Sequence, residues 1–187
     1  MLKHPQWLLF PNAISKEECD AWVALGRTID AQDATTFGGH GDSIRKTLVR
    51  WLPDTPPFDT IHAKLREIVH EANEQFNVDL THLPPLQFTE YADVGHHYGA
   101  HQDIDWARQD GFHRKLSITV QLSDSDDYTG GDFAFGHHEN PSAEMSRQQG
   151  TILVFLSYQE HSVSPILSGS RTSKTGLYGW SWITWTK

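Results

Sequence analysis

Two stretches in the first half of the chain repeat their apolar residues with helical spacing. Ser15 and Glu18 form the pattern of a capping box, in which each side chain accepts a hydrogen bond from the other residue's backbone amide. Gly26 is typical of a helix end, so we predict a helix over residues 15–26. The apolar side of this helix comprises Cys19, Trp22, Val23 and Leu25.

A second helix is predicted from Asp59 onward. Its apolar face comprises Ile61, Leu65, Ile68, Val69 and Ala72. Its solvated face is expected to carry His62, Lys64, Arg66 and Glu67. Around these helices we predict an entry strand and turn over 5–13 and a short strand from Lys46 to Leu52. The polar, glycine-bearing segment 30–45 indicates a loop.

After Pro84-Pro85 the apolar residues repeat with a period of two, which is typical of β-strands. Leu86 and Phe88 alternate with polar residues, and the stretch 116–122 does the same. Further strands are predicted at 96–101, 132–136, 143–147, 151–157, 161–166 and 177–185. Many short strands separated by turn residues predict a mainly β fold, a jelly roll or small barrel, with N-terminal helices covering one sheet. We expect a single domain over 1–187, with helical support over about 1–83 and a jelly-roll core over about 84–187.

The faces of two predicted strands differ in character. Ser117, Thr119 and Gln121 lie on one side of the strand over 116–122, so that side either meets water or lines a polar cavity. The strand over 151–157 is apolar on both sides, which indicates a strand buried on both faces.

Composition and charge narrow the classes of partner. The chain has 187 residues and a formal net charge of −9, which argues against binding to nucleic-acid backbones. Its single cysteine, Cys19, excludes an intrachain disulfide and favours a reducing compartment. No apolar run approaches the roughly 18 residues of a membrane span, and the first ten residues do not resemble a signal peptide. We therefore expect a soluble, cytoplasmic protein without a membrane or nucleic-acid partner; no oligomeric state is favoured.

A short motif suggests metal chemistry. His101 and Asp103 are two residues apart, so on a strand both side chains would project to the same face. A second imidazole, His161, opens a later strand, and two histidines with one carboxylate form the facial triad of non-haem ferrous iron. In a chain with 12 histidines the motif alone is weak evidence; His97 is a weaker candidate ligand, and Asp105 is expected to be a loop residue. His137 and His138 are expected to be exposed in a turn.

Two further residues stand at regular distances from this motif. Tyr91 precedes His101 by ten residues, and Arg171 follows His161 by ten. A strand partner could present Arg171 to a dicarboxylate cosubstrate, although a surface ion pair is the other interpretation.

Several segments resemble one known family. The segments are Leu86–Asp103 (LQFTEYADVGHHYGAHQD), Arg114–Phe135, Gly150–Trp180 and, nearer the N-terminus, FPNAISKEECDAWVALG and IRKTLVRWLP. They resemble the iron(II)- and 2-oxoglutarate-dependent dioxygenases, in particular the prolyl 4-hydroxylase-like branch. The resemblance implies a double-stranded β-helix, the jelly roll of cupin-like proteins.

The resemblance also implies a site. His101, Asp103 and His161 match the catalytic iron ligands, and Arg171 matches the residue that pairs with the C5 carboxylate of 2-oxoglutarate. Tyr91 matches a tyrosine beside the cosubstrate, and Tyr98 is a further cavity candidate. Fe(II), 2-oxoglutarate and O2 would be required, with ascorbate as a candidate reductant. The chain departs from the family after Ser173, where Lys174-Thr175-Gly176 precede the strand at Leu177.

The implied reaction is hydroxylation of an unactivated C–H bond with release of succinate and CO2. The resemblance favours a prolyl residue in a peptide or protein, and a free amino acid or another small molecule is the alternative. Loops 35–45 and 104–113, the latter with Trp106 and Arg108, either close over the substrate or are ordinary surface loops. Two other classes remain: a cupin-like metal-binding protein without oxygenase activity, which would not need Arg171, and a non-catalytic module, which would tolerate loss of Asp103 or His161. The complete metal and cosubstrate set favours the oxygenase.

Overall fold

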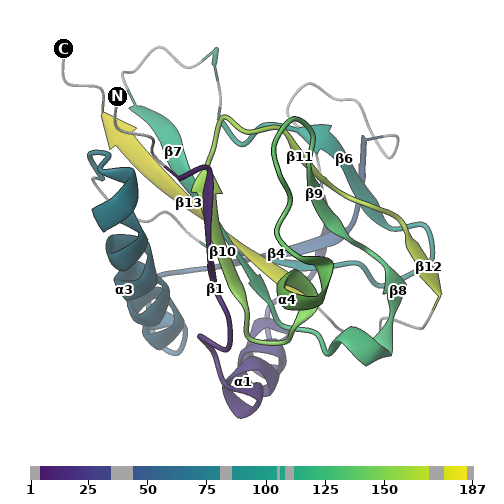
Figure 1. The fold of residues 1–187 in the computed structure, drawn as a ribbon. Coiled ribbons are helices and arrows are strands. Elements are labelled where there is room, and N and C mark those ends of the chain that lie inside the picture. The colour runs from purple at the N-terminus through teal and green to yellow at the C-terminus, as the bar shows by residue number, and fades with distance from the viewer. Residues whose placement is uncertain are drawn as a thin grey trace.

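Two facing β-sheets form the body of the protein, and helices cover the outer face of the larger sheet (Figure 1). The computed structural model describes residues 5–34, 44–80, 86–104, 106–107, 112–168 and 175–184, with Phe112 and the last range described by their backbone. Within these ranges the larger sheet has the order β1-β10-β7-β13-β5-β4-β2 and the smaller one β3-β6-β11-β9, while β12 and β8 form a short separate pair.

The helical elements and the strands have the following bounds. The helical elements are α1 (Lys16–Gly26), α3 (Asp59–Phe76), the 3-10 turn η1 (Ser125–Asp127) and α4 (Ala143–Arg147). The strands up to the middle of the chain are β1 (Trp7–Phe10), β2 (Gln32–Asp33), β3 (Arg45–Lys46), β4 (Leu48–Leu52), β5 (Leu86–Glu90), β6 (His97–His101) and β7 (Phe112–Gln121). The later strands are β8 (Thr129–Gly130), β9 (Phe133–Phe135), β10 (Ile152–Leu156), β11 (His161–Val163), β12 (Ile166–Ser168) and β13 (Thr175–Thr184).

Helix α1 begins and ends where the sequence predicts. The Ser15 hydroxyl accepts from the Glu18 amide at 3.2 Å, and the Glu18 carboxylate accepts from the Ser15 amide at 3.0 Å, which is the predicted capping box. At the other end, a Cβ on Gly26 would lie 2.6 Å from the Phe88 ring. The absence of a side chain at Gly26 therefore lets α1 pack closely on β5.

The main core lies between the helices and the larger sheet. Its members on the sheet side include alternating residues of β5, β7 and β10, which agrees with the period of two in the sequence. These strand residues are Leu86, Phe88, Leu116, Ile118, Val120, Ile152 and Val154. The alternate residues of β5 and β7 face the smaller sheet, so this arrangement turns the polar side of β7 toward the space between the sheets.

Helix α3 buries the predicted apolar face, but His62 does not lie on its solvated side. His62 is fully buried, and its Nε2–H donates to the Leu52 carbonyl at 3.0 Å. The prediction was wrong because the end of β4 packs against this turn of the helix and leaves a carbonyl that needs a donor.

Three other expectations need correction. Residues 143–147 form helix α4 and not a strand, because Ser142 caps the Met145 amide at 3.4 Å and the segment consists largely of helix-forming residues. The predicted strand over 161–166 is two strands, β11 and β12, interrupted before Pro165. The segment 30–45 contains β2 and β3, while residues 35–43 lie outside the described ranges.

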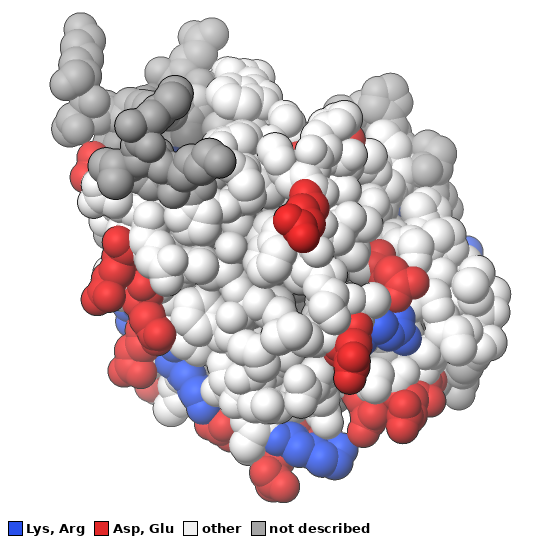
Figure 2. All heavy atoms as spheres, in the orientation of Figure 1, with Lys and Arg blue, Asp and Glu red and all other residues white. Residues whose placement is uncertain are grey.

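Surface and core features complete the fold. The face shown in Figure 2 carries acidic side chains scattered with fewer basic ones between them, in keeping with the net charge of −9. Cys19 is buried in the main core, and burial raises the pKa of its thiol to about 12, so it acts as a packing residue. In the described ranges, every helix is too short or too polar to cross a bilayer.

Candidate metal centre

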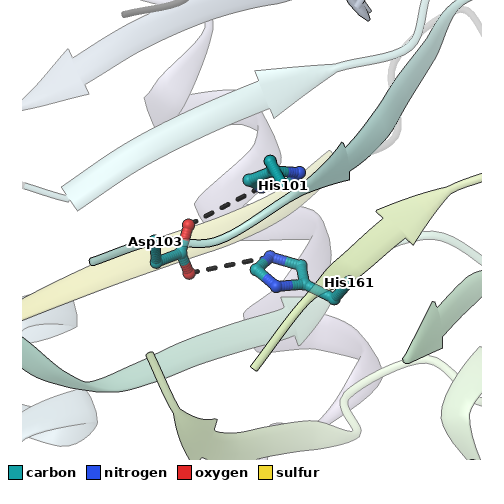
Figure 3. Close-up of side chains that lie close together, drawn as sticks. All are labelled: His101, Asp103 and His161. Carbon is teal, nitrogen blue, oxygen red and sulfur yellow. Dashed lines mark ion pairs between the residues drawn. The ribbon is translucent and has the colours of Figure 1, made fainter. Parts of the chain in front are cut away.

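Strand pairing brings two distant histidines together. Strands β6 and β11 run antiparallel, and their register places His101 directly opposite His161. Side chains opposite each other on antiparallel strands lie on the same face, and the two imidazole centroids are 4.2 Å apart. Both rings therefore reach the space between the sheets from neighbouring strands (Figure 3).

Asp103 lies just beyond the end of β6 and is held through its backbone. Its amide donates to the Ser157 carbonyl at 3.0 Å, and Arg114 donates from Nη1 to the Asp103 carbonyl at 3.1 Å. The sequence interpretation placed Asp103 on the strand itself. The strand stops at His101, and these contacts turn the carboxylate to the side of the histidines.

The Asp103 carboxylate stands between the two imidazoles. Oδ1 lies 3.6 Å from His101 Nε2, and Oδ2 lies 3.7 Å from His161 Nε2. Ser117 donates its hydroxyl to Oδ2 at 2.5 Å, and since that uses its only proton, the Ser157 hydroxyl at 2.8 Å donates to Ser117. One potential ligand atom from each of the three residues falls within 4.8 Å of the others.

Both histidines are held in the tautomer that a metal ligand needs. His101 Nδ1 lies 2.8 Å from the Gly99 carbonyl, and His161 Nδ1 lies 3.0 Å from the Gln159 carbonyl. A carbonyl only accepts, so each Nδ1 carries the proton and each Nε2 keeps a lone pair. Neither Nε2 has a hydrogen-bond partner among the residues that the structure describes, although both are buried.

These atoms fit a bound divalent metal. A buried nitrogen without a partner is costly, and coordination would satisfy both Nε2 atoms at once. Two imidazoles and one carboxylate are the donor set of non-haem Fe(II) sites that leave coordination positions open. The Nδ1 contacts and the Ser117 contact are the outer partners that orient such ligands.

Tyr98 borders the centre. Its ring stacks on His101 with the centroids 3.5 Å apart and the planes inclined by 11°. The Arg45 guanidinium lies over the same Tyr98 ring at 4.4 Å. Burial raises the pKa of Tyr98 to about 12, against the opposing effect of Arg45, so the phenol keeps its proton. Tyr91 is also buried, in a cluster with Tyr128, Val163 and Ile166.

Other residues named from the sequence lie outside this cluster or outside the described residues. His97 is not in the group, which comprises His101, Asp103 and His161. His137 and His138 are exposed, as predicted. Arg171, Asp105 and Arg108 lie outside the described residues. Trp106 is exposed and donates its indole N–H to Gln102 at 2.8 Å.

Burial also shapes the titration of the centre. Burial, followed by the neighbouring His161, lowers the pKa of His101 from 6.5 to about 4, and Asp103 opposes the shift. Between these two pH values the unfolded chain binds a proton at His101 that the folded, metal-free protein does not bind. Stability is therefore fully present above pH 6.5 and falls as the pH is lowered toward 4.

We expect the metal-free protein to lose about 3 kcal/mol of unfolding free energy to this proton between pH 7 and pH 4. Urea unfolding in the presence of a chelator measures the loss, and His101→Gln should flatten the dependence. His137→Gln is the matched control, since that side chain is exposed. A His101→Gln profile as steep as that of the unaltered protein would contradict the assignment.

A second prediction concerns the hydroxyl pair behind Asp103. Ser117→Ala removes the hydrogen bond to Oδ2, so the carboxylate is no longer held in one orientation. We expect metal affinity to fall about 10- to 100-fold, as for other outer partners of metal ligands. Cobalt(II) titration by visible absorption measures it, with Ser146→Ala, a change in helix α4, as the control. Equal affinities in the two variants would exclude this role for Ser117.

Comparison with known proteins agrees with a metal centre in this chain. A family model described as the 2OG-Fe(II) oxygenase superfamily matches residues 86–182, which is just over half of the chain. The chain belongs to this superfamily. Membership implies Fe(II), 2-oxoglutarate and O2, and it confirms the resemblance drawn from the sequence.

Individual members of the 2OG-Fe(II) oxygenase superfamily resemble the chain over most of its length. A PKHD-type hydroxylase of Saccharophagus degradans is 27% identical, with 88% of this chain and 74% of the relative aligned. The crystal structure of a Pseudomonas putida prolyl-4-hydroxylase superposes with a TM-score of 0.73 at 19% identity, covering 98% of this chain and 95% of the other. A prolyl hydroxylase from Trichoplax adhaerens, in complex with a hypoxia inducible factor peptide fragment, gives 0.71 at 17% identity and covers 94% and 83%.

These likenesses confirm the predicted jelly-roll fold of the prolyl 4-hydroxylase-like oxygenases. The chain spans only about a third of the length of three other PKHD-type hydroxylases, with 36%, 34% and 35% of each aligned.

Some residues around the centre had no assigned role in the sequence. The Ser157 and Gln159 carbonyls accept hydrogen bonds from Asp103 and His161, and Arg114 donates to the Asp103 carbonyl. Contacts to backbone carbonyls leave no spacing pattern in the sequence. Ser117 left one signal, since its strand carries a polar face that the sequence predicted either to meet water or to line a cavity. Arg45 lies in the segment IRKTLVRWLP, and the resemblance of that segment to the family implied no role for Arg45.

Proposed function

We propose that this protein is an Fe(II)- and 2-oxoglutarate-dependent dioxygenase that hydroxylates a prolyl residue of a peptide or protein. The observation that carries the proposal is the convergence of two buried, unpartnered Nε2 atoms on one carboxylate. Among the described residues this is the one group of histidine and carboxylate side chains with metal-binding geometry.

Each residue of the centre has a part in the proposal. His101, Asp103 and His161 would hold iron from one side, and the other side would remain open to 2-oxoglutarate and dioxygen. Bound iron would supply the oxidation of an unactivated C–H bond. One oxygen atom of O2 would enter the substrate as a hydroxyl, and the other would enter succinate as 2-oxoglutarate loses CO2.

The cosubstrate needs a cation at its far end. We propose Arg171 for the C5 carboxylate and Tyr91 as a neighbour of the cosubstrate, because both match the family by position. The protein's contribution is to orient the ligands and to exclude water. The burial of Asp103 and His161 supports the second role.

The substrate class rests on the relatives. PKHD-type and prolyl hydroxylases are among them, and one solved relative holds a peptide fragment, which supports a prolyl residue in a peptide or protein. A small carboxylic acid, such as a free amino acid, is the second candidate. One observation favours it: a buried arginine beside the centre has no carboxylate partner among the described residues.

Three further expectations belong to the proposal. The chain acts as a single domain, ascorbate keeps the iron ferrous during turnover, and the protein works in the cytoplasm. The lone, buried Cys19 supports a reducing compartment.

The test is succinate release from 2-oxoglutarate with Fe(II) under air. A panel of proline-containing peptides is compared with the same peptides carrying alanine, and with free amino acids. We expect succinate in excess over the uncoupled background only with a hydroxylatable substrate, and a mass gain of one oxygen on that substrate. Metal binding without any 2-oxoglutarate consumption would contradict the proposal and favour a cupin-like metal-binding protein.

A further inference from the structure

Arg45 is a buried cation surrounded by neutral groups. It is only 4% exposed, at the start of strand β3. Its Nε donates to the Thr47 hydroxyl at 2.9 Å, and its Nη2 donates to Gln87 Oε1 at 2.7 Å. A third, longer contact joins Nη2 to the Thr89 hydroxyl at 3.4 Å. All three acceptors are uncharged.

Four other arginines of the described residues have a carboxylate partner. Arg50, which is also largely buried, contacts Glu90, and Arg147 contacts Asp132 at 2.6 Å. No carboxylate of the described residues lies within ion-pair distance of Arg45, and its Nη1 has no acceptor among them. A charge removed from water without an opposite charge is destabilising by several kcal/mol in general. Among the described residues, this arginine therefore has no anion that offsets its charge.

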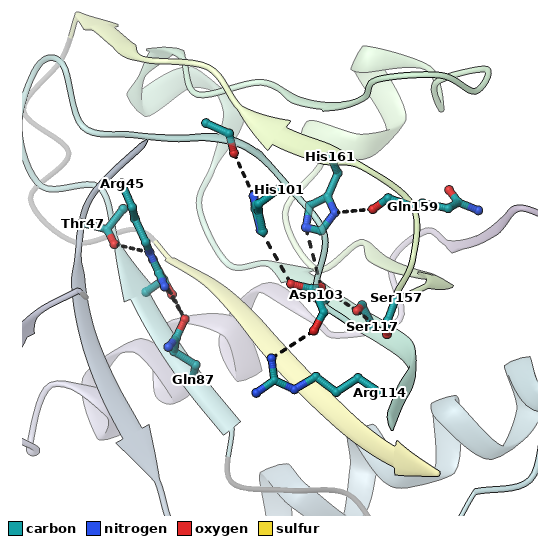
Figure 4. Close-up of polar contacts among 12 residues, drawn as sticks. Arg45, Thr47, Gln87, His101, Asp103, Arg114, Ser117, Ser157, Gln159 and His161 are labelled. Carbon is teal, nitrogen blue, oxygen red and sulfur yellow. Dashed lines mark hydrogen bonds and ion pairs between the residues drawn. The ribbon is translucent and has the colours of Figure 1, made fainter. Parts of the chain in front are cut away.

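The position of Arg45 connects that charge to the metal centre. Its guanidinium lies over the Tyr98 ring, and the imidazole of His101 stacks on the same ring. Figure 4 shows Arg45, Thr47 and Gln87 grouped beside His101 and Asp103, in front of the larger sheet.

The neutral neighbours orient the guanidinium. Gln87 and Thr89 lie on the face of β5 opposite the main core, and Thr47 holds Nε from the other side. Because these contacts use Nε and Nη2, the N–H groups of Nη1 remain to donate to a carboxylate oxygen.

We propose that Arg45 binds a carboxylate of an organic acid held beside the triad. The inference rests on the proposed function and names a recognition element for it. The carboxylate has two possible sources: the far end of 2-oxoglutarate, or the acid group of the hydroxylated substrate. If Arg171 takes the far end of 2-oxoglutarate, Arg45 serves a substrate that carries a carboxylate, which favours the small carboxylic acid named as the second candidate above.

The first arm of the test uses the full chain loaded with Mn(II) under nitrogen. Dissociation constants are measured for 2-oxoglutarate and for 2-oxobutyrate, which lacks the far carboxylate. Arg45→Gln should weaken 2-oxoglutarate about 10- to 100-fold and leave 2-oxobutyrate unchanged, if 2-oxoglutarate is the source. Arg66→Gln, which removes a cation from the exposed side of α3, is the matched control.

The second arm uses the Mn(II) protein saturated with 2-oxoglutarate. Free L-amino acids and their amides are titrated by calorimetry, with L-proline and L-prolinamide as the first pair. If the substrate is the source, Arg45→Gln lowers the affinity for the acid to that for the amide and leaves the amide unchanged. Arg45→Lys keeps the charge without the planar fork and should give an intermediate loss, and it replaces Arg45→Gln in both arms if that variant does not fold.

The two arms distinguish the two sources of the carboxylate. A selective loss for the carboxylate-bearing ligand in either arm supports the inference and identifies the source. Unaltered affinities for 2-oxoglutarate and for all the acids, with the unaltered protein binding 2-oxoglutarate normally, would overturn it. Failure of the proposed function is a different result, because the unaltered protein itself would then show no metal-dependent binding of 2-oxoglutarate.

Discussion

Asp103→Ala is expected to abolish the Fe(II)-dependent conversion of 2-oxoglutarate to succinate. The variant removes the carboxylate that lies between both histidines, at 3.6 Å from one Nε2 and 3.7 Å from the other. Outer partners of metal ligands cost 10- to 100-fold when removed, so loss of a proposed ligand should exceed about 100-fold in metal affinity. Succinate release and cobalt(II) titration measure the two effects.

The protein should nevertheless remain folded in this variant. The change leaves the Ser117 hydroxyl without its acceptor, at a cost of about 1–3 kcal/mol, which is less than the usual stability of a domain. Circular dichroism checks this, and Asp20→Ala, at an exposed carboxylate in α1, is the control. Turnover in folded Asp103→Ala equal to that of the control would refute the assignment of the triad.

Divalent metal is expected to raise the melting temperature of the protein by about 10 °C at a concentration near a thousand times its dissociation constant. Binding to the folded state alone contributes about 4 kcal/mol at that ratio, and each kcal/mol shifts the midpoint of a chain this size by about 2–4 °C. The metal satisfies two buried nitrogens and one buried carboxylate at the same time.

Thermal unfolding with and without cobalt(II) measures the shift, and an excess of chelator should reverse it. The shift should disappear in His161→Ala, whose Nε2 is one of the two unpartnered atoms. His138→Ala, at an exposed histidine, should keep the full shift. An equal shift in both variants would mean that the metal binds elsewhere on the chain.

The sequence predicted the fold class through regular spacing, and it predicted the three clustered residues through spacing together with the resemblance to a known family. The antiparallel register of β6 and β11 places His161 directly opposite His101, so both imidazoles lie on the same face of the sheet. Turn residues and a capping box placed most of the elements within a few residues of their observed bounds.

What the sequence did not predict depends on tertiary contacts. His62 is buried because a particular carbonyl of β4 meets it, and helical periodicity does not contain that information. Residues 143–147 form a helix through a serine cap that the short segment did not signal clearly. The neutral neighbours of Arg45 could not be predicted either, because strands that are distant in the sequence, β3, β5 and β6, bring these side chains together.

The connection between β10 and β11 has a consequence for how this centre can be tuned. Ser157 holds Asp103 through its carbonyl, Gln159 holds His161 through its carbonyl, and the Gln159 side chain is tied to the backbone of Gln6 at 2.6 Å. One short turn therefore contacts two proposed ligands, Asp103 just beyond β6 and His161 in β11, and is itself hydrogen-bonded to Gln6. Changes in that turn displace both ligands in concert, so the geometry of the centre can drift or be engineered without altering any residue that would touch the metal.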